Sequence, residues 1–257
     1  MIEKRRSGNL PFDQYPVVSA SLDDLDISLF QKAYLPFAIS PEVLELNERS
    51  IEQQLISLRF LSKKGIPDIA SIIVFGKDPV AWIGGAYIQF LRIDGTEITD
   101  PIKDQKVITG PMPYQISQLD EILKAHIFIS SDVTKGLKEQ KQPDYPFIAL
   151  QQLTRNAILH RTYESTNAPT RIYWFNDRIE IHNPGGLYGQ VNESNFGKGV
   201  TDYRNPLLAE AMKVLGYVQR FGMGIPLAYK ECQKNGNPVP EFTFNPSYVL
   251  VTVKKVQ

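Results

Sequence analysis

The sequence predicts an α+β protein with two lobes, the second of which packs helices on one face of a mixed sheet. From residue 147 onward the predicted order is a helix, a hairpin, a loop, two helices and closing strands, which is typical of that layering. The 257 residues exceed the usual ~100–150 of one domain, and Pro143 and Pro146 interrupt the chain. We therefore place the boundary between the lobes near residue 140.

The first lobe begins with a segment that has no clear hydrophobic period and contains Pro11 and Pro16. The run 69–79 is apolar and ends at a glycine and a proline, so it fits a buried helix or a strand equally well. The remaining predicted elements of this lobe are an extended arm over 1–20, helices over 22–37 and 44–64, a hairpin of 86–95 with 106–110, and a helix over 114–125.

The second lobe gives clearer hydrophobic periods. Residues 147–160 place apolar side chains at helical spacing, and 206–215 begins with a proline in the first turn, where its missing N–H costs nothing. The predicted elements of this lobe are helices over 147–160, 206–215 and 225–234, strands over 170–175 and 178–181, and one or two strands over 242–253.

Composition excludes several classes of protein. Lysine plus arginine and aspartate plus glutamate number 28 each, without the basic excess of a nucleic-acid clamp, so we expect DNA contact only through segments absent from this chain. Cys232 stands alone, which excludes an internal disulfide framework and a cysteine-based zinc site. The N-terminus lacks a signal-peptide core and no run approaches ~20 apolar residues, so we expect a cytoplasmic protein without membrane contact.

Polar residues on the helix 147–160 are the first candidate site. Asn156 follows Gln152 by four residues, so the two side chains project from one face of the helix. An asparagine carbonyl oxygen suits Mg²⁺, which prefers hard oxygen donors. The same spacing also fits the polar stripe of an ordinary amphipathic helix.

Two glycine-containing turns are the next candidates. In the segment 177–189 a strand runs into Asn-Pro-Gly-Gly, where Gly185 and Gly186 allow close backbone approach and Asn183 offers both a donor and an acceptor to a base edge. Gly222 and Gly224 precede a helix whose free N–H groups can bind an anion. Each segment alone is also a generic turn or helix start.

The ordered set of segments resembles the ATP-binding lobe of the GHKL superfamily, which includes gyrase, Hsp90, MutL and the histidine kinases. Over residues 145–245 it is more closely similar to the divergent ATPase-like C-terminal domain of bacterial regulators labelled RecG-related. The residues that carry the resemblance are Asn156, Ala157, His160, Arg161 and Tyr163; 177–187; Arg204, Asn205, Pro206, Leu208 and Ala209; and Gly222, Gly224 and Ile225.

This resemblance implies a Bergerat-like α/β sandwich that binds ATP and magnesium. Asn156 would ligate Mg²⁺ through its carbonyl oxygen, and Asn183 would hold adenine. The glycines Gly185, Gly186, Gly222 and Gly224 would let the backbone approach the nucleotide, as this resemblance implies. Arg204 and Lys198, in the loop that resembles a lid, are candidates for phosphate contact.

The front of the chain, residues 1–140, resembles the distal part of an AlbA-like, Schlafen-type DNA-binding domain, and residues 141–257 form the GHKL-like part. The proximal core motif and a winged helix found in relatives are absent, which indicates a truncated chain. The resemblance implies an ATP-sensing transcriptional regulator, and a homodimer is compatible with it.

The sequence departs from active GHKL enzymes at two positions. Gln152 stands where the resemblance places a glutamate general base, so a contribution of ~100–10,000-fold to hydrolysis is missing. Asn183 replaces the usual aspartate, which removes charge assistance from the hydrogen bond to adenine. No Gly-x-x-x-x-Gly-Lys-Ser/Thr loop occurs, so helicase motor activity has no support. A degenerate scaffold for dimerisation or protein contact, and a slow ATPase with another base, remain as alternatives.

Overall fold

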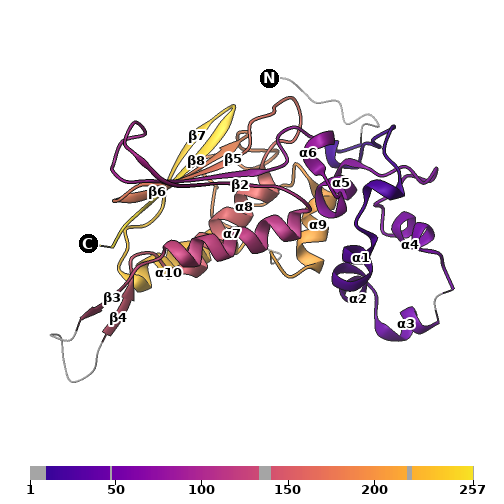
Figure 1. The fold of residues 1–257 in the computed structure, drawn as a ribbon, viewed down its shortest axis with the longest axis horizontal. Helices are drawn as coiled ribbons and strands as arrows, with labels where there is room; N and C mark the ends of the chain where they lie inside the picture. The colour runs from indigo at the N-terminus through magenta and orange to yellow at the C-terminus, as the bar shows by residue number, and fades with distance from the viewer. Residues whose placement is uncertain (1–9, 47, 133–139, 219–221, 257) are drawn as a thin grey trace.

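A six-stranded mixed sheet forms the centre of the computed structural model, which describes residues 10–46, 48–132, 140–218 and 222–256. The strand order is β2-β1-β5-β6-β8-β7, with β1 and β5 parallel and the other four pairs antiparallel (Figure 1). The strands are β1 (Ile88–Ile93), β2 (Ile102–Ile108), β5 (Thr170–Trp174), β6 (Arg178–Pro184), β7 (Glu241–Asn245) and β8 (Tyr248–Lys254). The α+β class and the predicted hairpins are confirmed.

The sheet takes strands from both sides of residue 140, because β1 pairs with β5 across the predicted boundary. The division into two lobes at that position stays a prediction. Successive side chains of a strand point to opposite faces of the sheet. Along β6 the side chains of Ile179, Ile181 and Asn183 are buried, whereas those between them are half-buried.

Four helices lie against one face of this sheet (Figure 1): α7 (Met112–His126), α8 (Phe147–His160), α9 (Pro206–Val214) and α10 (Gly224–Asn235). Helix α8 packs against both α10 and β6, and its buried Leu153 and Ala157 belong to one continuous core. A separate two-stranded hairpin of β3 (Ile129–Asp132) and β4 (Gln140–Pro143) projects from one end.

Short helices and turns make up the N-terminal part, at the opposite end from that hairpin (Figure 1). The run 69–79, which fits a helix or a strand by sequence, forms a helix over Ile69–Phe75, and a second short helix begins at Pro79. The elements here are η1 (Phe12–Gln14), η2 (Leu22–Asp24), α1 (Ile27–Leu29), η3 (Phe30–Tyr34), α2 (Leu35–Ala38), α3 (Pro41–Glu45), α4 (Ile51–Ser57), α5 (Ile69–Phe75) and α6 (Pro79–Trp82).

The predicted helix over 44–64 is wrong, because the chain forms α3 and α4 there instead. Ser50 starts α4 with a capping box, in which its hydroxyl accepts from the Gln53 N–H and the Gln53 side chain accepts from the Ser50 N–H. Arg59 then adopts a φ of 66°, a left-handed conformation that a continuing helix does not allow. Local capping and this turn outweigh the hydrophobic period.

A buried arginine joins three segments at the middle of the molecule. Arg161 follows α8 and is only 2% exposed. Its guanidinium donates to the carbonyl oxygens of Gly85, of Ala168 at 2.6 Å and of Thr162 at 3.2 Å, and it lies over the Tyr163 ring at 4.7 Å. A fork of fixed N–H groups suits several carbonyls at once, so Arg161 locks the end of α8 to the segments that enter β1 and β5.

Two further buried polar side chains, Asn205 and Asp13, hold the start of α9 in place. The buried Asn205 amide donates to the carbonyl oxygens of Leu159 and Arg161, both at 2.9 Å. At the start of α9, the carboxylate of buried Asp13 accepts from the backbone N–H groups of Leu207 at 2.7 Å and Leu208 at 3.0 Å. The N-terminal segment thereby caps a helix almost 200 residues later in the chain, where a negative charge is favoured.

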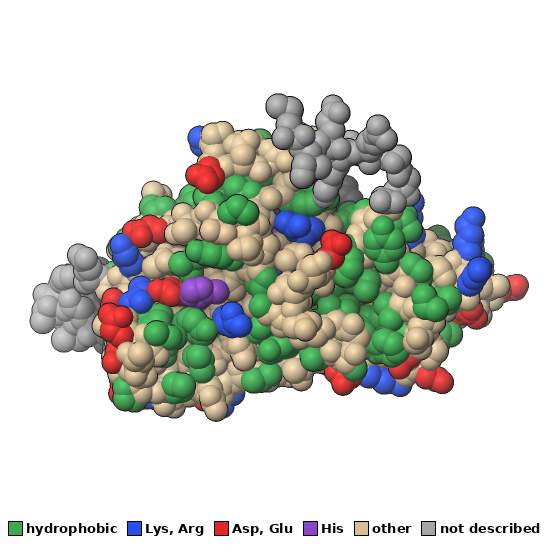
Figure 2. All heavy atoms as spheres, turned by 90° about the horizontal axis from the view of Figure 1, so that it is seen from above, with side chains coloured by type: hydrophobic (Ala, Val, Ile, Leu, Met, Phe, Trp, Pro, Cys, Tyr) green, Lys and Arg blue, Asp and Glu red, His purple; other side chains and the backbone are tan. Residues whose placement is uncertain are grey.

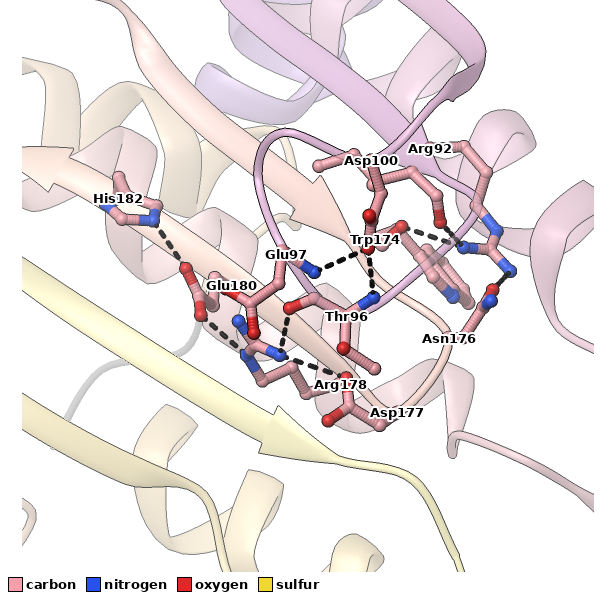
Figure 3. Close-up of polar contacts among 11 residues, drawn as sticks. Arg92, Thr96, Glu97, Asp100, Trp174, Asn176, Asp177, Arg178, Glu180 and His182 are labelled. Carbon is pink, nitrogen blue, oxygen red and sulfur yellow. Dashed lines mark hydrogen bonds and ion pairs between the residues drawn. The ribbon is translucent and has the colours of Figure 1, made fainter.

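Another polar cluster ties the loop between β1 and β2 to the turn between β5 and β6 (Figure 3). Arg178 bonds the Glu180 carboxylate at 2.7 Å and the Thr96 carbonyl oxygen at 3.0 Å, and Glu180 also contacts His182 at 2.9 Å. Arg92 donates to the Trp174 carbonyl oxygen at 2.9 Å. These side chains bond one another and nearby backbone carbonyl oxygens, and they hold the end of the sheet together.

Surface charges are mixed in sign. On the face shown in Figure 2, acidic and basic side chains are interspersed among hydrophobic ones. Such a face lacks the single-signed field that attracts a polyanion. Among the helices of the described ranges, none has the length and apolar character to cross a membrane.

We predict that Arg161→Lys destabilises the chain by about 2–4 kcal/mol, because one ammonium group cannot serve three carbonyls held by a fork. Urea unfolding of the variant measures this change. Arg171→Lys, at a half-buried arginine of the same sheet that contacts Gln89, is the control and should cost less than about 1 kcal/mol. Equal costs for the two variants would contradict the role assigned to Arg161.

We also predict a pH-dependent gain of stability from Asp13→Asn. Burial raises the pKa of Asp13 from its usual 3.8 to about 6. Between these values the folded state binds more protons than the unfolded state, so Asp13 lowers the unfolding free energy as the pH rises through this window. An asparagine carbonyl can still cap α9 without the buried charge.

The difference in unfolding free energy, Asp13→Asn minus wild type, should therefore become more positive between pH 5 and pH 8, by about 1.4 kcal/mol. Urea unfolding at the two pH values measures it. Groups that do not interact with Asp13 cancel in the comparison, whereas the charge of Asp13 contributes to the raised pKa of Asp68, so its removal adds to the change in the same direction. A difference that stays constant, or that falls as the pH rises, would show that the charge at the start of α9 outweighs its desolvation.

Candidate functional site

One cavity lies between α8, β6, the loop that follows β6, and the start of α10. It opens to solvent, and its lining encloses about 1120 Å³ of space that includes part of that solvent. Seven of the nine site residues predicted from the sequence line it: Gln152, Asn156, Asn183, Gly185, Gly186, Gly222 and Gly224. The fold brings together segments that are up to about 70 residues apart.

Helix α8 supplies the polar wall of the cavity. Gln152 and Asn156 are both half-buried and lie on the face that lines it, as their spacing of four residues requires. On the other side of the helix, Gln151 and Arg155 contact Asp120 of α7 at 2.7 and 3.1 Å. The two faces therefore differ: one holds the helices together, and the other presents amides to the cavity.

Asn183 comes from β6 and is only 5% exposed. Its Oδ1 accepts a hydrogen bond of 3.1 Å from the hydroxyl of Thr170 on β5, the neighbouring strand. Sequence reasoning missed Thr170. The turn at Asn176-Asp177 contained the signal, because the register of that hairpin, with Arg171 opposite His182, makes Thr170 and Asn183 neighbours.

The four glycines have structural reasons to lack a side chain. Gly185 has a φ of 100°, and a Cβ on Gly186 would lie 2.6 Å from the Asn245 carbonyl oxygen. Gly222 has a φ of 64° and lies against Thr201, whereas a Cβ on Gly224 would lie 3.3 Å from Gln152 Oε1. Gly224 therefore lets the start of α10 approach the amide of Gln152 across the cavity.

Two predicted phosphate contacts lie elsewhere. Arg204 is not among the residues found to line the cavity; it donates to the Gly186 carbonyl oxygen at 3.0 Å and lies over the Tyr188 ring at 4.7 Å. Lys198 is likewise outside the lining and donates to the Ser194 carbonyl oxygen at 2.9 Å. Arg204 supports the wall from behind, since both Gly186 and Tyr188 line the cavity.

His160, one of the residues that carry the resemblance, lines the cavity as well. Its ring stacks on Tyr203 with centroids 5.6 Å apart and an interplanar angle of 13°. Burial, with a contribution from the positive charge of Arg204, lowers the pKa of His160 to about 4. The imidazole is therefore neutral at pH 7, where one ring nitrogen can donate and the other accept.

Charge is sparse in the cavity walls. Within the described ranges the lining includes no lysine or arginine, and Asp202 is its one carboxylate. The described residues also include no group of three or more histidine, cysteine, aspartate or glutamate side chains that could hold a metal ion. The rest of the lining is largely apolar, with Val249 and Val251 of β8 facing Leu153 and Ile225. Such walls suit a flat uncharged group, and any anion would need a cation brought with it.

Comparison with known proteins agrees with this arrangement. Residues 167–253 match a family model described as "Putative ATP-dependent DNA helicase recG C-terminal". The crystal structure of the DIP2311 protein from Corynebacterium diphtheriae shares the fold with a TM-score of 0.73 at 20% identity, over 98% of this chain and 49% of that one. The chain thus spans about half the length of that structure, and no curated protein matches it. Residues 167–253 are accordingly similar to the ATPase-like domain that this RecG-related family model describes.

Proposed function

We propose that this chain is a nucleotide-sensing regulatory module. Residues 141–257 would form a divergent GHKL lobe that binds a nucleoside triphosphate with Mg²⁺, and residues 1–140 would be the distal part of an AlbA/Schlafen-like segment. The observation that carries this proposal is the convergence of seven residues predicted from the sequence on one cavity. ATP is the first nucleotide to test, because the matched family is described as ATP-dependent.

Magnesium would be held by Asn156 together with the phosphates of the nucleotide. The Asn156 carbonyl oxygen is a suitable hard ligand in the cavity wall, and bound Mg²⁺ would neutralise phosphate charge. The 12-residue helix α10 begins at Gly224 beside it and presents backbone N–H groups and a positive dipole end. Because the described walls offer no lysine or arginine, the cation has a large part of the phosphate charge to balance.

Hydrolysis would be slow. Gln152 is the polar side chain beside the start of α10, where a general base would act on water. An amide orients water but cannot remove its proton. The site therefore suits sustained binding of the triphosphate, as a sensor requires, better than rapid turnover.

The bound state would be transmitted through the contacts around α9. Asn205 joins the start of α9 to the end of α8, which carries Asn156, and Asp13 joins α9 to the N-terminal segment. A shift of α8 on nucleotide binding would thus reach η1, which contains Asp13. We propose that DNA contact, in a transcriptional regulator of this kind, is made by segments outside this chain.

We predict that Asn156→Ala weakens ATP binding at least tenfold in the presence of Mg²⁺, through loss of the metal ligand. Isothermal titration calorimetry with and without Mg²⁺ measures this, and wild-type affinity should itself fall when EDTA is added. Gln151→Ala, on the opposite face of the same helix, is the matched control and should bind as wild type.

Binding of ATP that is equally strong in wild type, in Asn156→Ala and in EDTA would contradict the magnesium role. Absence of heat and of any shift in melting temperature with millimolar nucleotide would instead favour the degenerate scaffold, because a ligand of the folded state must raise its stability.

We further predict that Gln152→Glu increases phosphate release from ATP by about 100-fold or more, because a carboxylate at this position can accept the proton of water. The measurement is single-turnover phosphate release with saturating ATP and Mg²⁺, with Gln152→Ala as the variant that lacks both groups. If wild type releases phosphate slowly but measurably, and Gln152→Glu and Gln152→Ala leave that rate unchanged, another residue is the base and the slow-ATPase alternative gains support.

A further inference from the structure

Strand β2 is the outermost strand at one edge of the central sheet (Figure 1). Its seven residues pair with β1, and among the residues that the structure describes no backbone hydrogen bond joins its outer side to another segment. The strand carries exposed apolar side chains, with Ile102 at 55% and Val107 at 64% exposure. An open edge of this kind can pair with a strand of another chain.

The charges of β2 are arranged symmetrically about Gln105. Asp104 and Lys106 flank it on one face of the strand, and their side chains form an ion pair of 3.0 Å in which both remain partly exposed. Charged side chains commonly protect an edge strand from pairing, because they would meet like charges or lose water. In β2 the negative and the positive charge are placed so that the strand complements itself when it is turned around.

We propose that two copies of this chain pair through β2 in an antiparallel, two-fold symmetric arrangement centred on Gln105. Asp104 then lies opposite the partner's Lys106, and Lys106 lies opposite the partner's Asp104. Opposite charges placed directly across a pair of strands stabilise it, and each carboxylate here has an ammonium group from each copy beside it. This inference does not rest on the proposed nucleotide site, which lies between α8, β6 and α10.

Backbone geometry leaves few alternatives to this register. Two identical edges related by a two-fold axis run antiparallel, and residues that face each other must both point their N–H and C=O groups outward. The axis therefore passes through a residue, and an axis through Asp104 or Lys106 would place that charge opposite its own copy. Gln105 is also the middle residue of β2. The register of β2 against β1 is regular from Asp104 to Ile108 and shifts next to Ile102, so the charged pairs lie in its regular part.

Sedimentation equilibrium on the whole chain and on two charge reversals tests the proposal. One pair of strands buries less surface than a standard interface, so we expect a reversible dimer with a micromolar dissociation constant. Lys106→Asp and Asp104→Lys each place like charges opposite each other, and each should weaken the dimer at least about tenfold. An equimolar mixture of the two variants restores unlike charges across the strands, and it should form a heterodimer about as tight as the wild-type dimer.

Lys254→Asp is the matched control. It makes the same charge change at an exposed ion pair near the opposite edge of the sheet, where Lys254 of β8 contacts Glu241 of β7 at 2.6 Å, and it should leave the dissociation constant unchanged. Circular dichroism and the melting temperature report whether each variant is folded.

Single cysteines test the register. A residue on the two-fold axis faces its own copy at a separation that a disulfide can span, so mild oxidation should cross-link Gln105→Cys. Lys103→Cys lies away from the axis and should remain uncrosslinked. The natural Cys232 is buried and gives little background.

Three results overturn the inference. If the wild-type chain remains monomeric up to millimolar concentration, the edge of β2 does not pair with a second copy. A dimer that both charge reversals leave unchanged, or that Lys254→Asp weakens equally, has its interface elsewhere. Cross-linking of Lys103→Cys without cross-linking of Gln105→Cys would show that the strands do not meet about Gln105.

Discussion

The buried guanidinium of Arg161 is the interaction on which the cavity depends. It bonds carbonyl oxygens from the segments that lead into β1 and β5 and from the turn after α8. Because the guanidinium itself is buried, losing these bonds would leave its N–H groups without partners, and the end of α8 is held in one position relative to the sheet. Asn205, at the start of α9, also holds the end of α8, because its amide donates to the carbonyl oxygens of Leu159 and Arg161. The polar face of α8 is thus held against β6 at the separation that leaves a cavity between them.

This arrangement explains the two short motifs that accompany the candidate site. His-Arg-x-Tyr and Arg-Asn-Pro are read most simply as scaffold: Arg161 and Asn205 bond backbone, and Arg204 supports Gly186. His160 is the exception, since its neutral ring lines the cavity. Apart from Asp202 and three hydroxyl side chains, the polar side chains in the described lining are amides and an imidazole. The same chemistry accounts for the expected slow hydrolysis and for the expected dependence on a metal ion.

Sequence patterns predicted the parts of this structure that depend on local periodicity. Alternation located the strands of the sheet, and helical spacing placed Gln152 and Asn156 on one face. The helix over 44–64 failed because a cap at Ser50 and a left-handed Arg59 are short-range features that override hydrophobic spacing. Contacts such as Asp13 with Leu207 lie outside any local pattern, because they depend on how distant segments pack. Thr170 was within reach, since the hairpin register alone places it beside Asn183.

The central claim is that the cavity between α8, β6 and α10 is a nucleotide site. The most direct measurement is a map of ligand-induced chemical shifts in ¹⁵N-labelled protein, titrated with GTP and separately with ATP in the presence of Mg²⁺. Binding there should shift the side-chain amides of Asn156 and Asn183 and the backbone amides of 185–187 and 222–225, and should leave the amides of β2 in place. Saturable shifts confined to residues outside the cavity, or no shifts with either nucleotide, would contradict the claim.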